Sequence, residues 1–432
     1  MKAPRAIRFR PLNLGRWLTW GSTALLFALL PVVFGQGFAL TLLSQMGIMV
    51  IFALSYNMLL GQGGMLSFGH AVYYGLGAFF AIVVLREVAG GLGLPVALLP
   101  LVGGLGAALC GVVLGFPTTR RAGTPFAMIT LGIGEMVYAA ALMFPGLFGG
   151  EGGLTGDRTT GPRLPGLEWL TFGPQLQVYA LIAIWCFASM VAMFALMHTP
   201  LGRIANAVRD NPERAEFVGY NAQRVRWLVL ILASFFAGIA GGLSVINFEI
   251  AVTAENVGAI RSGGVLLAAF IGGTAFFFGP VLGAVVFTFF AVALSEYTKA
   301  WQLYLGLFFV LLVLFAPGGL ASLLMANLRV LRFRKFARLR DPYLGVTLTS
   351  LGVALGVVLL VELTYHVTLD LGHAPARLFG FPIEPGSASP WAFAVCVLLA
   401  SLAAFAYYRR GFRRCWDSIQ QEIEDQTGNG SP

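Results

Sequence analysis

The chain has 432 residues, of which 58% are hydrophobic and 11% are charged, and its formal net charge is +9. Soluble domains carry about 25% charged residues, so this composition excludes an ordinary soluble protein. Apolar runs of about 18 residues or more recur along the chain, and each is long enough to cross a bilayer as a helix. The sequence therefore predicts an all-α, polytopic membrane protein.

Twelve apolar stretches are predicted to be transmembrane helices. With the N-terminus inside, the segments left on the cytoplasmic side carry 22 of the 28 Lys and Arg residues. Because basic residues concentrate in cytoplasmic loops, this distribution predicts that both termini are cytoplasmic. It also explains the positive charge without a nucleic-acid partner. The stretches are 17–34, 38–60, 70–86, 95–116, 125–145, 177–197, 227–247, 259–276, 280–298, 301–316, 344–362 and 391–408.

The segment GQGGMLSFGHAVYYGLGAFF, residues 61–80, follows the second stretch and contains six glycines. We expect the helix to break near residues 61–66. Backbone freed in a membrane has to be buried in protein or line a watery cavity. The alternative to a pathway is close helix packing on glycine, with the polar side chains bonded to backbone. The candidates for a solute pathway near this break are Asn57, Gln62, Ser67 and His70.

Two features follow between residues 125 and 176. Glu135 lies within the fifth stretch, where a carboxylate is costly and usually faces a bundle interior or a partner. It is a further pathway candidate, and the alternative is a hydrogen-bonded glutamate that joins two helices. The segment 146–176 is rich in Gly, Pro and Thr, which predicts an irregular outer loop, partly packed over a pore mouth.

A compact polar stretch, TPLGRIANAVRDNPERAEFVGYN, occupies residues 199–221 between two apolar runs. Apolar residues recur at i, i+3, i+4 and i+7 from Leu201 to Val208, which predicts one short helix. Asn211 as N-cap, Pro212 at the first helical position and Gly219 as a stop predict a second. This punctuation indicates a rigid hairpin on the cytoplasmic side. The alternative is an amphipathic hairpin that lies on lipid headgroups.

The chain beyond residue 328 differs from what precedes it. A basic run at 329–343 is followed by two further spans within 344–408 and a polar cytoplasmic tail at 409–432. We interpret the basic run as a stop-transfer flank that contacts anionic membrane lipid. Together with a basic N-terminus and first helix at 1–37 and a core at 38–328, these boundaries divide the chain into five parts.

No catalytic or energising motif is present in the sequence. The patterns G-x-x-x-x-G-K-[ST], H-E-x-x-H and G-x-S-x-G are absent. The four cysteines and four histidines show no metal-ligand spacing. The sequence therefore predicts a non-catalytic membrane subunit with no catalytic residue, no metal and no cofactor.

Five segments together resemble the LivM-type permeases, which are branched-chain amino-acid subunits of bacterial ABC importers. The likeness covers residues 40–325 in one collinear order, and the residues beyond about 341 fall outside it. The segments are SYNMLLGQGGMLSFGHAVYYGLGAFFA, FAMITLGIGEMVY, TPLGRIANAVRDNPERAEFVGYN, IGGTAFFFGPVLGAVVF and LFFVLLVLFAPGGL.

The resemblance implies a type II ABC-importer-like permease bundle in the bacterial inner membrane, with broken helices and two appended C-terminal spans. Its implied partners are a LivH-like permease, two cytoplasmic ATP-binding subunits, a periplasmic solute-binding protein and membrane lipid. The hairpin would dock in a groove of an ATP-binding subunit. The implied contact residues are Arg203, Ile204, Val208, Arg209, Asp210, Glu213, Arg214 and Glu216.

The expected function is therefore the import of branched-chain or other small amino acids. Related permeases of the same family carry urea, short amides or small organic acids, and the sequence does not separate these solutes. A stand-alone secondary transporter or channel would need networks of acids or histidines inside the membrane, and only Glu135 and His70 hint at one. A membrane scaffold or sensor is a third alternative, although no sizeable soluble domain supports it.

Overall fold

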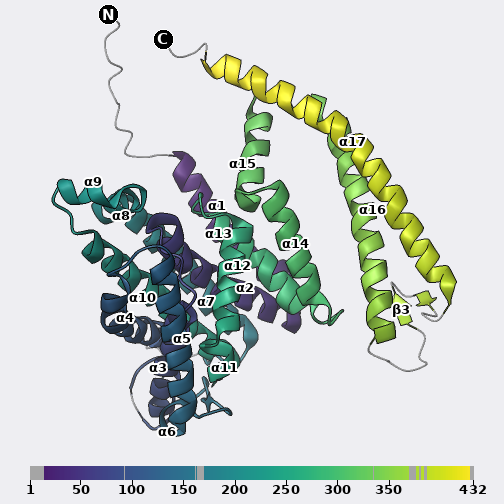
Figure 1. Cartoon of the computed structure of the whole chain (residues 1–432). Coiled ribbons are helices and arrows are strands. Elements are labelled where there is room, and N and C mark those ends of the chain that lie inside the picture. Colours follow the sequence, from purple (N-terminus) through teal and green to yellow (C-terminus); the bar gives the residue numbers. More distant parts are fainter. Residues whose placement is uncertain are drawn as a thin grey trace, which may run out of the picture. The chain divides into compact units, whose positions relative to one another are not determined.

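A computed structural model describes residues 14–91, 93–160, 162, 170–333, 335–368, 376–378, 381–383 and 387–428 (Figure 1). These residues are almost entirely helical, with two short two-stranded antiparallel ladders. The chain divides into two compact units. The first runs to Leu294 and includes Phe309–Ala321, and the second contains Ser295–Phe308 and the chain from Ser322 onward.

Thirteen α-helices lie in the described part of the first unit, together with a 3-10 helix and two π-helices. The α-helices are α1 (Leu14–Val33), α2 (Gly37–Asn57), α3 (Ala71–Ala89), α4 (Leu99–Thr118), α5 (Thr124–Met143), α6 (Pro145–Phe148), α7 (Gln175–His198), α8 (Pro200–Asp210), α9 (Pro212–Phe217), α10 (Ala222–Phe248), α11 (Thr253–Asn256), α12 (Ala259–Gly272) and α13 (Gly279–Thr288). The shorter elements are η1 (Met58–Gln62), η2 (Val96–Leu98), η3 (Phe289–Leu294), β1 (Leu154–Thr155) and β2 (Ile250–Ala251).

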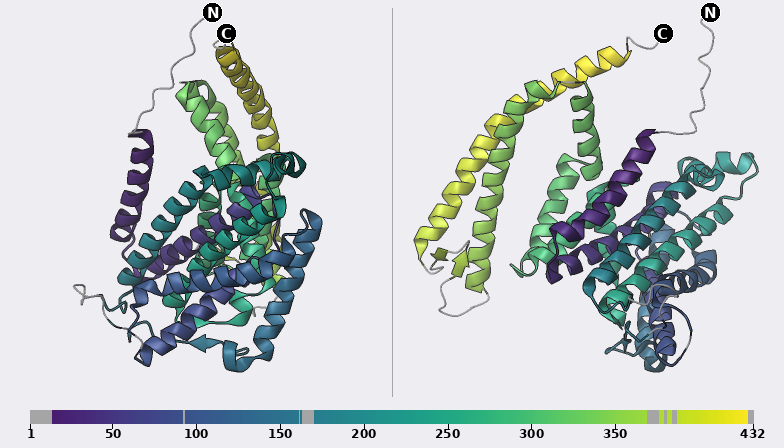
Figure 2. Two further views of the ribbon diagram at one scale, coloured as in Figure 1. Left: turned by 90° about the vertical axis from the view of Figure 1, so that its left-hand side faces the viewer. Right: turned by 180° about the vertical axis from the view of Figure 1, so that it is seen from behind.

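The remaining elements are α14 (Trp301–Phe315), α15 (Gly319–Arg332), α16 (Phe336–Thr368), β3 (Ala376–Leu378), β4 (Phe381–Ile383) and α17 (Ala388–Gly428). Within the second unit, α16 and α17 run side by side, as the right-hand view of Figure 2 shows. Gly345, Gly352 and Gly356 of α16 allow the close approach, because a Cβ at each would press on a residue of α17. With 33 and 41 residues, both helices are longer than the ~20 residues that span a bilayer.

Length and composition allow eight of the described helices to cross a membrane, or nine if the bent pair α14–α15 counts as one span. The structure therefore supports a multi-pass membrane protein. All twelve predicted stretches are helical for most of their length, but two form shorter helices than expected. They are 259–276, where α12 has 14 residues, and 280–298, where α13 continued by η3 ends at Leu294.

The helix α12 is short because the chain turns at Gly272–Gly279, inside a region that is apolar apart from Thr274. Gly273 adopts φ +94°, a left-handed conformation that side chains disfavour, so the helix ends there. Hydropathy alone does not detect such a turn, since the turn residues are themselves apolar.

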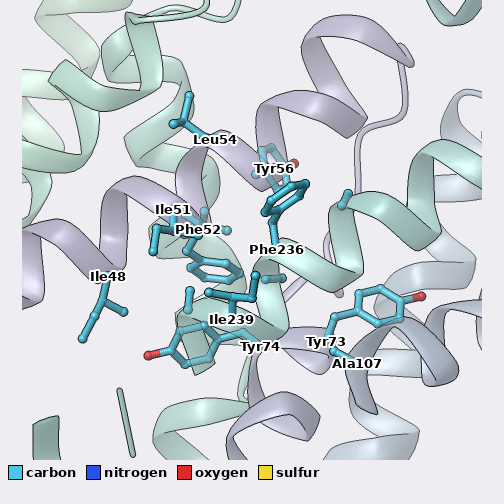
Figure 3. Close-up of a cluster of buried hydrophobic side chains, with 14 of the residues drawn as sticks. Ile48, Ile51, Phe52, Leu54, Tyr56, Tyr73, Tyr74, Ala107, Phe236 and Ile239 are labelled. Carbon is cyan, nitrogen blue, oxygen red and sulfur yellow. The ribbon is translucent and has the colours of Figure 1, made fainter. Parts of the chain in front are cut away.

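The helix α10 lies at the centre of the first unit, where it packs on α3 and α4. Figure 3 shows Phe236 and Ile239 of α10 in a buried cluster with Phe52 of α2 and Tyr74 of α3. The rings of Phe52 and Tyr74 are 4.7 Å apart between centroids. This core holds α2 and α3 in place on either side of the segment that joins them.

A set of glycines permits the close crossing of α3, α4 and α10. A Cβ at Gly103 of α4 would lie 2.7 Å from the carbonyl oxygen of Gly238 in α10 and 2.8 Å from that of Gly77 in α3. Small residues let membrane helices approach until their backbones touch. The high glycine content therefore has a packing role at this crossing.

We expect Gly103→Ala to lower the stability of the bundle by about 1–3 kcal/mol, because the new methyl group meets two backbone oxygens that cannot rotate away. Thermal unfolding in detergent measures the effect. Gly132→Ala is the matched control, since a Cβ there in α5 has nothing within 4 Å. Equal melting temperatures for the two variants would contradict the packing role of Gly103.

Candidate functional site

The predicted break between the second and third stretches is confirmed. The α-helix α2 ends at Asn57, continues as the π-helix η1 to Gln62, and α3 begins only at Ala71. Between them, Gly64 adopts φ +63°, which a residue with a side chain rarely tolerates. Residues 63–70 therefore form a non-helical connection, which we call the break.

Side chains from three other helices satisfy the backbone of the break. The amide of Phe68 donates to Thr130 Oγ1 of α5 at 3.2 Å, and the amide of Ala71 donates to Ser262 Oγ of α12 at 3.1 Å. The hydroxyl of Tyr56 donates to the carbonyl of Ser67 at 3.0 Å. Non-helical backbone inside a membrane protein is tolerated where protein groups take up its hydrogen bonds. The break is thus an integral part of the bundle.

His70 lies at the end of the break and is fully buried. Its ring is stacked on Phe52, with centroids 5.5 Å apart, and its Nε2 lies 3.0 Å from Ser55 Oγ. Since the Ser55 hydroxyl donates to the carbonyl of Phe52, its oxygen accepts from His70. This assigns the imidazole proton to Nε2 and leaves Nδ1 as an acceptor.

The structure brings the four pathway candidates of this region together around the break. Their exposed fractions are 2% for Asn57, 5% for Gln62, 1% for Ser67 and 0% for His70. A solute cannot reach them in this conformation. Asn57 Oδ1, Ser67 Oγ and His70 Nδ1 have no hydrogen-bond partner within the described part of the chain. Their polar atoms therefore become available only if the break opens.

Glu135 does not join this group. It is exposed in the middle of α5, near the equally exposed Met128 and Met136. The alternative of a hydrogen-bonded strut is not seen, because no hydrogen bond or ion pair joins Glu135 to another described residue. A carboxylate at mid-helix is costly against lipid. This face of α5 therefore needs water or another protein subunit beside it.

The hairpin is present as predicted. Asn211 Oδ1 caps α9 by accepting from the amide of Arg214 at 2.9 Å, and Gly219 ends it with φ +95°. Asn221 caps the following helix α10 in the same way, accepting from Arg224 at 2.9 Å. Figure 1 shows α8 and α9 at one end of the first unit and α6 at the other.

The apolar side of the hairpin is seated on the bundle. Ala205, Val208 and Ala215 are 1%, 2% and 7% exposed, and Ile204 packs partly against the same core. Val208 therefore faces inward, whereas its predicted role was contact with another subunit. The other predicted contact residues are exposed: Arg203, Arg209, Asp210, Glu213, Arg214 and Glu216.

Two apolar residues are exposed at the end of α9. Phe217 is 92% exposed and Val218 is 72% exposed. By helical spacing Val218 is expected to share the apolar side of the hairpin with Ala215, and this expectation is wrong, because Ala215 is buried and Val218 is not. Phe217 is not among the predicted contacts, and the signal for it in the sequence is an apolar pair directly before the stop glycine. We call Phe217 and Val218 the hairpin tip.

At the opposite end of the first unit, the loop that follows α6 is held by one arginine. Arg158 donates to the carbonyl oxygens of Phe172 at 2.7 Å and Ile246 at 2.9 Å, among others, and its backbone amide donates to Glu249. The strands β1 and β2 pair beside it. The described part of this loop is therefore packed on the end of α10; its packing over a pore mouth stays a prediction.

A cleft of about 500 Å³ lies beside this loop, lined by Arg86, Ala89, Thr155, Gly156 and Asp157. Hydrogen bonds from the side chain and backbone of Thr159 hold the pKa of Asp157 below its usual value. The Asp157 carboxylate is thus ionised at neutral pH and makes this end of the molecule locally polar.

A family model described as the permease component of branched-chain amino acid transport systems matches residues 38–317. The chain belongs to this family. It is 28% identical over 307 residues to the high-affinity branched-chain amino acid transport system permease protein LivM of Escherichia coli K12, covering 66% of this chain and 70% of that protein. Its identity to LivM of Salmonella typhimurium LT2 is also 28%, over 303 residues and with the same coverage. No solved structure matches the chain.

Membership of this family makes the chain a multi-pass permease of a transport system, which works with partner subunits. The matched region contains the break, the hairpin and the exposed face of α5. It ends within the segment that follows α14, so α16 and α17 lie outside it. The family's permeases are transport components and not enzymes.

We predict that Ser262→Ala destabilises the permease by about 1–3 kcal/mol, because it leaves the buried amide of Ala71 without its acceptor. Ser244→Ala is the matched control. Ser244 is equally buried, but its hydroxyl donates to a carbonyl of its own helix. Removal of this hydroxyl therefore leaves no backbone amide without an acceptor. Thermal unfolding in detergent compares the two, and an equal loss in both would argue against a special role for Ser262.

Proposed function

We propose that this permease is a transmembrane subunit of an ATP-driven ABC importer that moves branched-chain or other small amino acids across the bacterial inner membrane. One observation carries the proposal. The chain has no nucleotide-binding motif of its own, yet it carries a rigid, capped hairpin that is seated on the bundle through Ala205 and Val208. Such an element suits the transfer of force from a separate motor subunit.

The hairpin tip is the proposed contact with a cytoplasmic ATP-binding subunit. A phenylalanine that is 92% exposed in water is unfavourable unless a partner covers it. Interfaces concentrate their binding energy on a few central apolar or aromatic residues, and charged residues form the rim. Phe217 and Val218 would supply the centre, with Glu213, Arg214 and Glu216 around them.

A LivH-like permease is the proposed partner at the exposed face of α5. The mid-helix carboxylate of Glu135 avoids hydrocarbon if this face lines a watery path between two permeases. Two ATP-binding subunits, one for each permease, complete the cytoplasmic side. Asn57, Gln62, Ser67 and His70 are proposed to face this path when the break opens.

A periplasmic solute-binding protein is proposed to dock at the opposite end, where Arg158 stiffens the outer loop. This assignment rests on the positive-inside distribution, with both termini in the cytoplasm. The basic run at 329–343 would contact anionic lipid, and the pair of spans at 344–408 would be an addition to the core at 38–328.

The choice of solute follows from the two relatives, which are named as branched-chain amino acid permeases. Urea, short amides and small organic acids are the alternatives within the family. A stand-alone secondary transporter is the alternative of another class. Within the described residues it receives no support from ionisable networks, because the His70 side chain is hydrogen-bonded to Ser55 and no hydrogen bond or ion pair joins it to Glu135.

The proposed function is tested with the permease, its sister permease and the ATP-binding subunits reconstituted in proteoliposomes with the binding protein. We expect leucine, isoleucine or valine uptake that requires ATP, since transport is coupled to a separate motor. The control is the permease alone in the same vesicles. Gradient-driven uptake by the permease alone would overturn the proposal, and ATP-driven uptake of urea or amides only would replace the solute.

We predict that Phe217→Ser weakens the binding of the ATP-binding subunit by about 2 kcal/mol, or roughly thirtyfold, as expected for a central interface residue. Tyr297→Ser is the control, since Tyr297 is 87% exposed but lies far from the hairpin in sequence. Co-purification and titration of the ATP-binding subunit measure the effect. Unchanged binding by Phe217→Ser would exclude the hairpin tip as the centre of the contact.

A further inference from the structure

A hydrogen bond joins the hairpin to η1, the helical turn directly before the break, across 148 residues of sequence. The Arg209 guanidinium, at the end of α8, donates through Nη1 to the carbonyl oxygen of Gly61 in η1. The buried side chains of the hairpin reach the bundle through apolar packing, so this polar contact is a separate connection, made two residues before the break begins.

The carbonyl of Gly61 needs this donor because of the way the helix ends. In a continuous α-helix the amide of Met65 would donate to Gly61, four residues earlier. Here the Met65 amide donates to Leu59 at 2.9 Å, and the Gly63 amide donates to Met58 at 3.2 Å. The π-helical turn therefore frees the Gly61 oxygen, at the negative end of the helix dipole, where a cation is favoured.

The break is shaped to receive the arginine. An added Cβ at Gly64 would lie 2.6 Å from Cγ of Arg209, so glycine at this position leaves room for the arginine stem. Asp210 binds Nε of the same guanidinium at 2.9 Å, which leaves the Nη atoms to reach the break. The contact thus depends on three residues: Gly64 leaves space for the arginine stem, Asp210 orients the guanidinium, and Arg209 donates the hydrogen bond.

We propose that Arg209 is the positioning residue that transmits movement of the hairpin to the break, and through the break to His70 and the start of α3. The inference rests on the proposed function, because it assumes that an ATP-binding subunit moves the hairpin. It changes the role of Arg209 from a contact with that subunit to a link inside the permease. The consequence is that binding of the motor and movement of the break can be separated by mutation.

The first test is Arg209→Gln in the complete reconstituted transporter, with Arg203→Gln as the matched control. Arg203 is an exposed arginine on the same helix with no contact to the break. We expect Arg209→Gln to assemble and to hydrolyse ATP as the wild type does, with uptake per ATP lowered about tenfold. Arg209→Lys should recover part of the uptake, since an ammonium group can donate to the Gly61 oxygen. Arg203→Gln should change hydrolysis and uptake in parallel.

The second test reaches the same contact from the break. Gly64→Ala places a methyl group against the Arg209 stem and should reproduce the loss of uptake per ATP. Gly123→Ala is its control, because Gly123 also has a positive φ, +69° against +63° for Gly64, but open space around its Cβ position. Both variants place a side chain at a positive φ, and only Gly64→Ala disturbs the arginine.

Hydrogen exchange of residues 58–70 supplies a readout that a merely stabilising residue would not change. In the wild type, ATP should alter exchange in both the hairpin and the break, whereas in Arg209→Gln only the hairpin should respond. The inference is overturned if Arg209→Gln keeps the wild-type ratio of uptake to hydrolysis. It is also overturned if Arg209→Gln loses assembly while Gly64→Ala transports normally. A wild-type complex whose uptake ignores ATP would instead refute the proposed function.

Discussion

Hydrocarbon offers no hydrogen bonds, and the architecture around the break follows from that constraint. When the continuous helix formed by α2 and η1 stops at Gln62 and α3 begins at Ala71, the freed amides and carbonyls require partners from the protein. Thr130 on α5, Ser262 on α12 and Tyr56 on α2 supply them. Three helices are thereby positioned by one interruption. A displacement of the break would change its hydrogen bonds to all three helices, so a local movement would affect α2, α5 and α12 together.

The glycines of the chain serve this arrangement in two different ways. At the crossing of α3, α4 and α10, Gly77, Gly103 and Gly238 remove side chains so that backbones meet, which makes the centre of the unit stiff. At the break, Gly64 provides a left-handed turn and space for Arg209. Close-packed helix interfaces resist gradual deformation. Because the centre of the unit is packed in this way, a movement of the helices is expected to be taken up at the break.

Much of this organisation can be predicted from the sequence, because its signals are local. Hydropathy locates the helices, clustered glycines locate the break, and Asn211, Pro212 and Gly219 define the hairpin. What cannot be predicted depends on contacts between distant segments. The pattern that places Val208 on an apolar face does not say whether that face meets the bundle or a partner. The link from Arg209 to Gly61 spans 148 residues and leaves no periodic trace. The turn at Gly273 lies within apolar sequence, so the stretch 259–276 has a shorter helix than its hydropathy implies.

Two residues of the folded chain lie in surroundings that suit the opposite kind of side chain. Glu135 carries a charge on the surface of an apolar helix, and Phe217 exposes an aromatic ring at the tip of a polar hairpin. Each costs free energy in an isolated subunit, the first against lipid and the second in water. Neither cost can be relieved by repacking within the chain, since the opposite faces of α5 and the hairpin already rest on the bundle. Both would be relieved by the proposed assembly, with a watery interface beside α5 and an apolar groove over the hairpin. Glu135 and Phe217, whose surroundings are unfavourable in the isolated chain, are thus the positions at which other subunits of a transporter would bind.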